Sequence, residues 1–216
     1  MISFFTKWWA RITCLILNIH VRIEGNGPIN PGSLIVANHV GAPDIFVLGS
    51  HFNGFFVSKA EIADWPLFNW LARLGKTVFV DRSKRHQVKT LIFEIEQRLN
   101  GDHSVILFPE AQATDGVDVM PFKSAVFEAA VLSNRPVVPV EIRYHDGHRP
   151  TIAYYGDSFI SHIFTLLKTA RLTATVSVMP MISSDKDRNT LADKSYQAVH
   201  DKHKLTSPYD SSYNQK

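Results

Sequence analysis

A histidine and an aspartate five residues apart, His39 and Asp44, are the side chains of this sequence best placed to move a proton. They lie in residues 37–44, Ala-Asn-His-Val-Gly-Ala-Pro-Asp, between an apolar run typical of a strand and the expected start of a helix. A neutral imidazole whose second nitrogen is held by a carboxylate can take a proton from an alcohol near neutral pH. The pair therefore predicts activation of a hydroxyl group without a metal. On these two residues alone a structural role stays open, because Asp44 can complement a helix N-terminus while His39 satisfies a buried carbonyl.

Three more charged residues follow predicted strands. Arg82 ends the run that begins at Gly75, and Lys84 comes two residues later. An arginine in this place can hold a phosphate or carboxylate through two hydrogen bonds, although a solvated arginine on a loop is the commoner case. Glu110 comes directly after a buried strand, where α/β proteins present their binding residues. It can contact substrate hydroxyls or brace its own loop.

The elements that must position these residues alternate along the chain. Short β-branched runs are followed by longer stretches at helical spacing, which predicts a single α/β domain with a central mixed sheet flanked by helices. The expected strands are 20–24, 33–37, 54–58, 77–80, 104–108, 136–143, 152–155 and 173–178. The expected helices are 43–50, 67–73, 87–99, 122–133 and 188–202.

Composition limits the class of protein. With 216 residues, 45% hydrophobic and 20% charged, the chain has the balance of one folded domain. The only cysteine, Cys14, excludes an intrachain disulfide and a cysteine-based metal cluster, and it favours a reducing compartment. The net charge of +3 is weak evidence for nucleic-acid binding, and we expect no nucleic-acid partner.

Residues 1–19 read as a helix rich in large apolar side chains, interrupted by Lys7 and Arg11. The uninterrupted apolar run is too short to cross a bilayer, so we expect a monotopic interfacial helix whose cations reach toward lipid headgroups. The alternatives are a helix buried against the domain and a signal peptide, for which no small-residue cleavage site follows. The predicted organisation is this helix, an enzyme domain over 20–203 and a polar tail over 204–216.

Four short segments follow one another along the chain. The first is an Asn-His followed by four residues and an Asp, the second a Gly, an aromatic residue and an Arg, the third Phe-Pro-Glu, and the fourth a proline between valines. In this chain they are Asn38, His39 and Asp44; Gly75, Phe79 and Arg82; Phe108, Pro109 and Glu110; and Val138, Pro139 and Val140. In this order they resemble the motifs of the glycerolipid acyltransferase family, and the resemblance covers about residues 20–195.

The resemblance implies a membrane-associated O-acyltransferase that acts at the cytoplasmic face of the inner or plasma membrane. It would transfer a fatty acyl group from acyl-CoA or acyl-carrier protein to a lysolipid hydroxyl, with no cofactor and no metal. The first expectation for the acceptor is 1-acylglycerol-3-phosphate, which gives phosphatidic acid in phospholipid biosynthesis. The implied general base is His39, oriented by Asp44. The implied substrate-binding residues are Arg82 and Lys84 for the polar head, Glu110 for the acceptor or its loop, Pro139 for the pocket wall, and Gly75, Phe79 and Pro109 from the same motifs.

The third motif departs from the family pattern. The family often has Gly, Thr and Arg after the glutamate, whereas this chain has Ala111, Gln112 and Ala113. Without that arginine, recognition of a phosphate must rest on Arg82 and its neighbours, or the acceptor is not a simple phosphate. The continuation around Thr114–Gly116 looks similar to the branch that acylates lyso-ornithine lipid, which is the alternative acceptor. A non-catalytic lipid-binding protein is the alternative from another class.

Two other classes are disfavoured. His145 and His148 lie on either side of an Asp-Gly pair after a strand, a pattern more often found in a solvated hairpin than in a metal site. No Gly-x-Ser-x-Gly occurs, which argues against a hydrolase with a nucleophile elbow.

Overall fold

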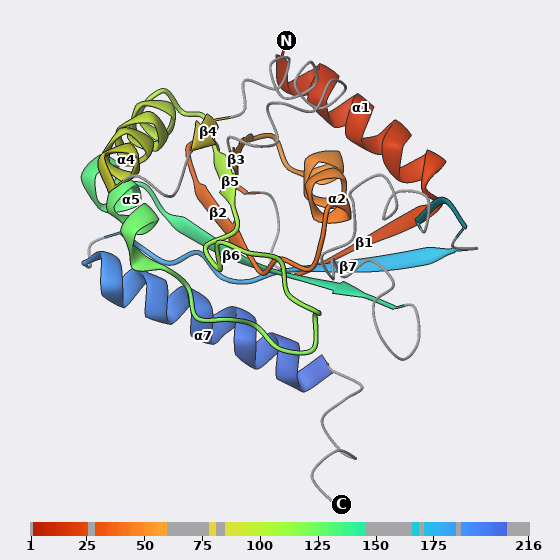
Figure 1. Ribbon diagram of the computed structural model, residues 1–216. Helices are drawn as coiled ribbons and strands as arrows, with labels where there is room; N and C mark the ends of the chain where they lie inside the picture. Colours follow the sequence, from red (N-terminus) through yellow and green to blue (C-terminus); the bar gives the residue numbers. More distant parts are fainter. Residues whose placement is uncertain are drawn as a thin grey trace, which may run out of the picture.

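The structure, a computed structural model, describes residues 2–25, 29–59, 78–80, 85–145, 166–168, 171–184 and 187–206. Within them lies a seven-stranded sheet in the order β1-β7-β6-β2-β5-β3-β4 (Figure 1). Its neighbouring strands are parallel except for β6 and β7, which are antiparallel. The strands are β1 (Ile19–Gly25), β2 (Leu34–Ala37), β3 (Phe55–Lys59), β4 (Val78–Val80), β5 (Val105–Leu107), β6 (Val137–Tyr144) and β7 (Leu172–Val178).

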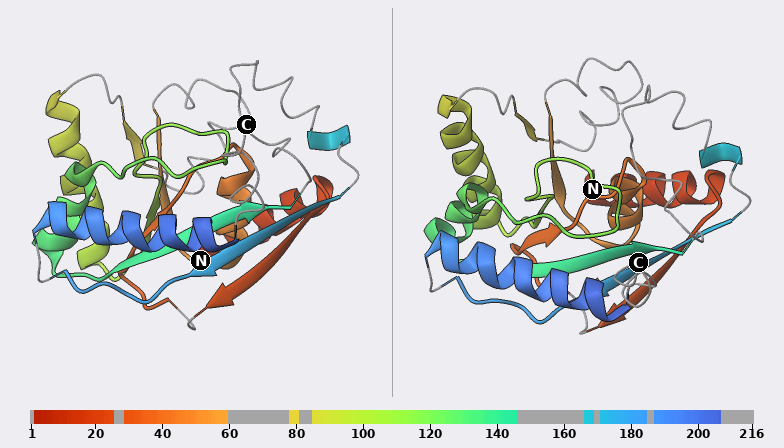
Figure 2. Two further views of the ribbon diagram at one scale, coloured as in Figure 1. Left: turned by 90° about the horizontal axis from the view of Figure 1, so that it is seen from below. Right: turned by 60° about the horizontal axis from the view of Figure 1, so that its bottom comes forward.

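Helices cover both faces of this sheet (Figures 1 and 2). The α-helices α1 (Ile2–Ile16) and α2 (Pro43–His51) lie on one face. On the other face lie α4 (Arg85–Asn100), the 3-10 helix η2 (Ser124–Phe127), α5 (Glu128–Ser133) and α7 (Arg188–Thr206). The predicted α/β domain with a mixed sheet flanked by helices is confirmed.

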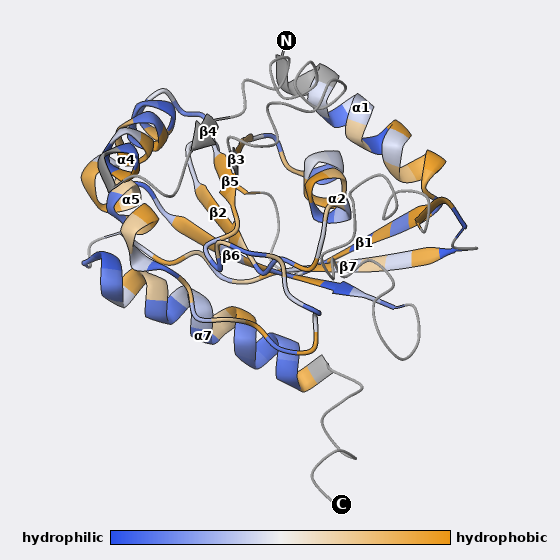
Figure 3. Cartoon of the chain, in the orientation of Figure 1, coloured by the Kyte–Doolittle hydropathy of each residue, from blue (hydrophilic) through white to orange (hydrophobic). Residues whose placement is uncertain are grey.

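The central strand β2 shows why the sequence folds into two cores. Leu34 and Val36 pack with α4, α5 and α7, while Ile35 and Ala37 pack with α1 and α2. All four side chains are buried. Side chains alternate between the faces of a strand, so a strand covered on both faces must be apolar throughout. The hydropathy colouring shows the central strands as mainly apolar, with apolar and polar residues alternating along the helices around them (Figure 3).

One face of α1 belongs to the core next to α2. Ala10 and Cys14 of α1, and Leu17 directly after it, follow each other at helical spacing and are buried. The two helices cross closely, since a Cβ atom added at Gly49 of α2 would lie 3.3 Å from the Ala10 Cβ. Burial raises the pKa of the Cys14 thiol to about 11, so this cysteine packs as a neutral side chain.

The two cations of α1 hold the carboxyl end of α2. Lys7 Nζ donates a hydrogen bond to the His51 carbonyl oxygen (2.9 Å), and Arg11 Nε donates to the Ser50 carbonyl oxygen (3.1 Å). Cations are favourable at this end of a helix, where carbonyl groups lack partners and the dipole is negative. These side chains therefore have partners in the protein, where the sequence suggested lipid headgroups.

Other boundaries differ from the predicted ones. The expected helix 122–133 is a 3-10 turn followed by the short α5, and α7 continues to Thr206, past the predicted start of the polar tail. The helix expected at 67–73 and the strand expected at 152–155 lie outside the described residues. Of the helices that the structure describes, none combines the length and apolar character needed to cross a membrane.

Candidate active site

Three neighbouring strands bring the candidate residues to one edge of the sheet. β2 lies between β5 and β6 and is parallel to both, so the carboxyl ends of the three strands meet. His39 follows β2, Glu110 follows β5, and Tyr144 is the last residue of β6. This is the edge at which parallel sheets place their ligand-binding residues.

His39 and Asp44 form the predicted pair. His39 Nδ1 lies 2.7 Å from Asp44 Oδ2, and the Asp44 side chain is fully buried. Because a carboxylate oxygen only accepts, Nδ1 carries the hydrogen of this bond. Among the described residues no group hydrogen-bonds to Nε2, and the His39 side chain is 22% exposed. The pair thus holds an imidazole with one nitrogen engaged and the other available to a substrate.

Asp44 receives further hydrogen bonds around its buried carboxylate. The backbone N–H groups of Val40 and Gly41 donate to Oδ2 at 2.7 and 3.1 Å. The Tyr144 hydroxyl donates to Oδ1 at 2.6 Å. Pro43 begins α2, so Asp44 also lies in the first helical turn, where negative charge is favourable. These donors compensate the cost of burying the charge.

The residues after β5 hold His39 from the other side. The Phe108 ring stacks on the imidazole with centroids 4.2 Å apart and planes 15° apart. Glu110 is buried, and its two carboxyl oxygens accept hydrogen bonds from the backbone N–H groups of His39 (2.7 Å) and Met120 (3.1 Å). This geometry supports the loop-bracing role among the two that the sequence left open for Glu110.

Glu110 has a shifted protonation equilibrium. Burial raises its pKa to about 8, against the lowering effect of the two backbone N–H donors. The negative charges of Asp44 and Asp118 add to the increase. Near neutral pH the site therefore contains one largely protonated carboxyl group, Glu110, next to the His39 backbone.

The 108–123 loop encloses the His39 peptide. The His39 carbonyl oxygen accepts hydrogen bonds from the Thr114 backbone N–H (2.8 Å) and hydroxyl (3.2 Å). The base of the loop is closed by a hydrogen bond from the Lys123 N–H to the carbonyl oxygen of Pro109, one of the predicted site residues (3.0 Å). Both backbone polar groups of His39 are thus bound by one loop.

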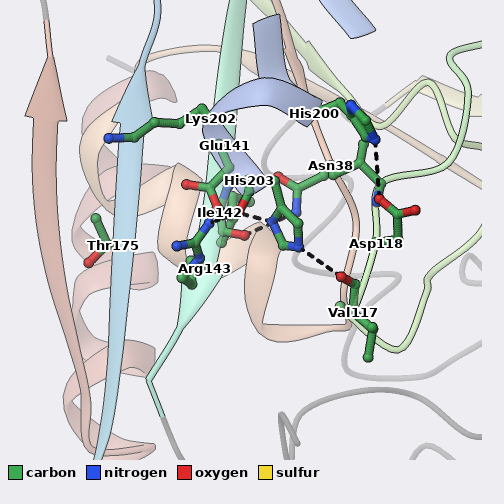
Figure 4. Close-up of polar contacts among 12 residues, drawn as sticks. Asn38, Val117, Asp118, Glu141, Ile142, Arg143, Thr175, His200, Lys202 and His203 are labelled. Carbon is green, nitrogen blue, oxygen red and sulfur yellow. Dashed lines mark hydrogen bonds and ion pairs between the residues drawn. The ribbon is translucent and has the colours of Figure 1, made fainter. Parts of the chain in front are cut away.

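Asn38, the first residue of the histidine motif, joins β2 to β6 (Figure 4). Its side-chain amide donates to the Ile142 carbonyl oxygen (3.0 Å), and its side-chain oxygen accepts from the Ile142 N–H (2.7 Å). These two bonds continue the pairing of β2 with β6 beyond the end of β2. Asn38 therefore sets the path of the chain that leads to His39.

The other predicted site residues are not gathered at the dyad by the described structure. Pro139 is buried within β6, in register with Val36, and its carbonyl oxygen accepts a hydrogen bond from the Met179 N–H (3.0 Å). The backbone of Phe79 belongs to β4. Gly75, Arg82 and Lys84 lie outside the described residues.

Tyr144 is the site residue that the sequence reasoning missed. A polar aromatic residue at the carboxyl end of a predicted strand is the signal that could have found it. Of the two histidines that the sequence disfavoured as a metal site, His145 lies among the described residues and His148 does not. His145 Nε2 lies 2.8 Å from the Thr175 hydroxyl oxygen. In the described part of the chain, no three His, Cys, Asp or Glu residues are grouped to hold a metal ion.

Proteins of known family resemble this chain in sequence. The family model described as "Acyltransferase" matches residues 18–143. The chain is 32% identical over 199 residues to a lyso-ornithine lipid O-acyltransferase of Rhizobium meliloti, covering 85% of this chain and 68% of that protein. It is 29% identical over 189 residues to a 1-acyl-sn-glycerol-3-phosphate acyltransferase of Neisseria gonorrhoeae, covering 85% and 74% of the two chains.

A solved structure has the same fold. The crystal structure of the 1-acyl-sn-glycerophosphate acyltransferase PlsC from Thermotoga maritima superposes with a TM-score of 0.74 at 21% identity, covering 94% of this chain and 78% of that chain. The dyad geometry and these matches agree, and the chain belongs to the acyltransferase family of enzymes.

Proposed function

We propose that this enzyme transfers a fatty acyl group from an acyl-CoA or acyl-carrier-protein thioester to the hydroxyl of a lysolipid. The observation that carries the proposal is the 2.7 Å contact between His39 Nδ1 and the buried Asp44 carboxylate, at the edge where three strands end. The similarity to lysolipid acyltransferases supports the same assignment.

His39 acts as the general base in this proposal. Its Nε2 takes the proton of the acceptor hydroxyl while the oxygen attacks the thioester carbonyl carbon. When the tetrahedral intermediate collapses, the C–S bond breaks and the imidazolium returns the proton to the leaving thiolate. Asp44 orients the ring and stabilises its positive charge. No acyl-enzyme forms, because the acceptor oxygen itself attacks the thioester.

For the acceptor we propose lyso-ornithine lipid, the second of the two acceptors that the sequence suggested. Residues 109–122 contain no lysine or arginine, and they include two aspartates. Asp115 directly follows the residue that binds the His39 carbonyl, and Asp118 comes three residues later. Acidic side chains suit the ammonium group of an ornithine headgroup better than a phosphate. The relative from Rhizobium meliloti carries the same activity in its name.

Lysophosphatidic acid is the second candidate acceptor. It is favoured by the Gly75, Phe79 and Arg82 motif, which would supply the cation for its phosphate, and by the relative from Neisseria gonorrhoeae. The two acceptors differ in the charge of their headgroups. An assay of both lipids side by side therefore shows which one the enzyme prefers.

We propose further that α1 rests on a membrane surface. Trp8, Ile12, Leu15 and Ile16 recur at helical spacing on the side of α1 away from the core, and they are 48–78% exposed. A helix that is apolar on its outer face and carries tryptophan binds at the lipid interface. The acceptor and product of the proposed reaction are both membrane lipids, so this placement brings the site to its substrate.

The test is an assay of the full chain on vesicles that contain lyso-ornithine lipid or lysophosphatidic acid, with acyl-CoA and acyl-carrier protein as donors and mass spectrometry of the products. We expect kcat/KM for lyso-ornithine lipid to exceed that for lysophosphatidic acid by about tenfold or more. Equal or faster acylation of lysophosphatidic acid would assign the second acceptor.

The matched variants are His39→Ala and, as a control, His20→Ala, whose side chain is exposed on β1. Loss of a general base lowers the rate by about 10²–10⁴-fold, so His39→Ala should be nearly inactive and the control unchanged. Full activity of His39→Ala would refute the mechanism. Failure of the wild-type protein to acylate either lipid would favour a lipid-binding protein.

A further inference from the structure

Tyr144 and Asp44 make a buried contact between residues far apart in the chain. The hydroxyl of Tyr144 lies 2.6 Å from Asp44 Oδ1, although 100 residues separate them. Tyr144 is 7% exposed and Asp44 is fully buried. A short hydrogen bond to a buried carboxylate is among the stronger polar contacts in a protein.

The two oxygens of Asp44 are held by different parts of the fold. Oδ2 accepts hydrogen bonds from His39, Val40 and Gly41, all in the same short turn. Oδ1 accepts a hydrogen bond from the hydroxyl of Tyr144, which belongs to β6. The terminal torsion of an aspartate is soft, so its orientation depends on how firmly both oxygens are held. The Tyr144 hydroxyl adds a restraint on the second oxygen, from a part of the fold outside the turn.

The sheet fixes Tyr144 independently of the turn. β6 pairs with β7 through Tyr144 and Ala174. Two residues earlier on β6, the Ile142 backbone forms two hydrogen bonds with the Asn38 side chain. Side chains alternate along β6, so Tyr144 shares its face with Ile142. Glu141 belongs to the opposite face, next to α7 (Figure 4).

We propose that Tyr144 is a positioning residue for catalysis. Its hydroxyl holds the Asp44 carboxylate in the orientation in which Oδ2 accepts the Nδ1 hydrogen of His39, and this directs the Nε2 lone pair toward the acceptor hydroxyl. The inference rests on the roles proposed above for His39 and Asp44. It adds the component that links the dyad to the sheet.

The first test compares Tyr144→Phe, which removes one oxygen and keeps the ring, with Tyr196→Phe on α7. We expect Tyr144→Phe to lower kcat about tenfold with less than about a twofold change in KM for donor and acceptor, because the hydroxyl acts on proton transfer. Tyr196→Phe should leave both parameters unchanged. Circular dichroism and thermal unfolding verify that both variants are folded.

The second test asks whether Tyr144 acts through Asp44. In an Asp44→Asn background, Tyr144→Phe should lower kcat by less than about twofold, since the carboxylate that it orients is gone. Fully multiplicative effects would overturn the proposal, and so would unchanged kcat in Tyr144→Phe.

A spectroscopic measurement separates positioning from a general loss of stability. With ¹⁵N-labelled histidine, the ring nitrogens of His39 report which of them carries the proton. We expect Tyr144→Phe to shift His39 away from the pure Nδ1–H tautomer of the wild type, with the His20 signals unchanged. An unaltered His39 spectrum would contradict the proposal. Activity in His39→Ala would instead refute the proposed mechanism itself, so the two failures are distinguishable.

Discussion

His39, the proposed base, is held through its backbone as well as its ring. Its N–H donates to Glu110, its carbonyl oxygen accepts from Thr114, and Nδ1 donates to Asp44. Proton transfer requires the base within hydrogen-bond reach of the hydroxyl, so residues that fix the base contribute to the rate without touching the substrate. At the scale of single residues, the site consists of one imidazole and the groups that prevent it from moving.

Glu110 should make the stability of the protein depend on pH. Its pKa is raised from 4.5 to about 8 in the folded state, chiefly by burial, so the folded protein retains a proton that the unfolded chain releases. The corresponding stability is fully present below about pH 4.5 and is lost as pH rises through about 8. Within this window the slope is about 1.4 kcal/mol per pH unit.

Urea unfolding of wild type and Glu110→Gln between pH 5 and 9 measures this slope. The variant should be less stable overall, because its amide NH₂ faces a backbone N–H, and its stability should lack the slope that Glu110 contributes. Glu96→Gln, on α4, is the control and should retain the wild-type slope. Equal slopes in wild type and Glu110→Gln would show that Glu110 titrates normally.

At the scale of the elements, the 108–123 loop contains an alanine in an unusual backbone conformation. Ala111 has a φ of 68°, in the left-handed region that favours glycine, at the position where the family pattern often has glycine. The left-handed conformation costs an alanine roughly 1–2 kcal/mol. The chain therefore tolerates local strain directly after Glu110.

Ala111→Gly should stabilise the protein. Relief of the strain exceeds the extra entropy that glycine gives the unfolded chain, and we expect a gain of about 0.5–1 kcal/mol in the free energy of unfolding. Ala113→Gly is the matched control, because Ala113 is not among the residues with positive φ and should lose about 0.4–1 kcal/mol. A loss of stability in both variants would show that Ala111 is not strained.

The helix α1 has one face in the core and another exposed on the surface. Its inner stripe is part of the core and its cations bind the end of α2, so deleting the helix would disturb the fold along with any membrane contact. Its outer stripe can be altered alone. Among its members, Leu15 is 78% and Ile16 is 65% exposed.

Leu15→Glu combined with Ile16→Glu should weaken binding to anionic vesicles by about tenfold or more, measured by co-sedimentation, because each change replaces apolar contact with a charge repelled by the surface. Leu132→Glu, on exposed α5 surface of the opposite face, is the control and should bind like wild type. Unchanged binding of the α1 variant would refute the proposed membrane surface.

At the scale of the whole molecule, a buried charged cluster joins α7 to β6 and to the 108–123 loop (Figure 4). Arg143 of β6 donates to Glu141 (2.7 Å) and to the carbonyl oxygen of His203 on α7 (2.8 Å). The His203 ring lies between Glu141 and the carbonyl oxygen of Val117, with Nδ1 and Nε2 at 3.2 and 3.3 Å. Strand, helix and loop meet at these few side chains.

Arg143→Met should lower the free energy of unfolding by about 3–5 kcal/mol, because it leaves the buried Glu141 carboxylate without its cation. Arg188→Met, which removes an exposed cation 3.7 Å from Glu128, should cost no more than about 1 kcal/mol. Denaturant unfolding of the two variants checks the difference. Similar small losses in both would show that the cluster contributes little to stability.

Local pattern was sufficient for most elements of the described fold. The strand β2 was predicted from an apolar run, and α4 from apolar positions at helical spacing, because both signals lie within a few neighbouring residues. The His39–Asp44 pair was predictable for the same reason, since one turn at the start of α2 brings the two side chains together. The carboxyl end of α7 and the 3-10 turn before α5 were not, because tertiary contacts decide where a helix ends.

The sequence by itself determined the class of fold, the elements that bear the site, and the histidine with its carboxylate. Only the tertiary structure decided that Glu110 binds the His39 backbone and that Tyr144 binds Asp44, across 71 and 100 residues. Those contacts depend on β2 lying between β5 and β6. The alternation of apolar and polar residues indicates which face of a strand is buried, but it does not indicate which other strands lie next to that strand.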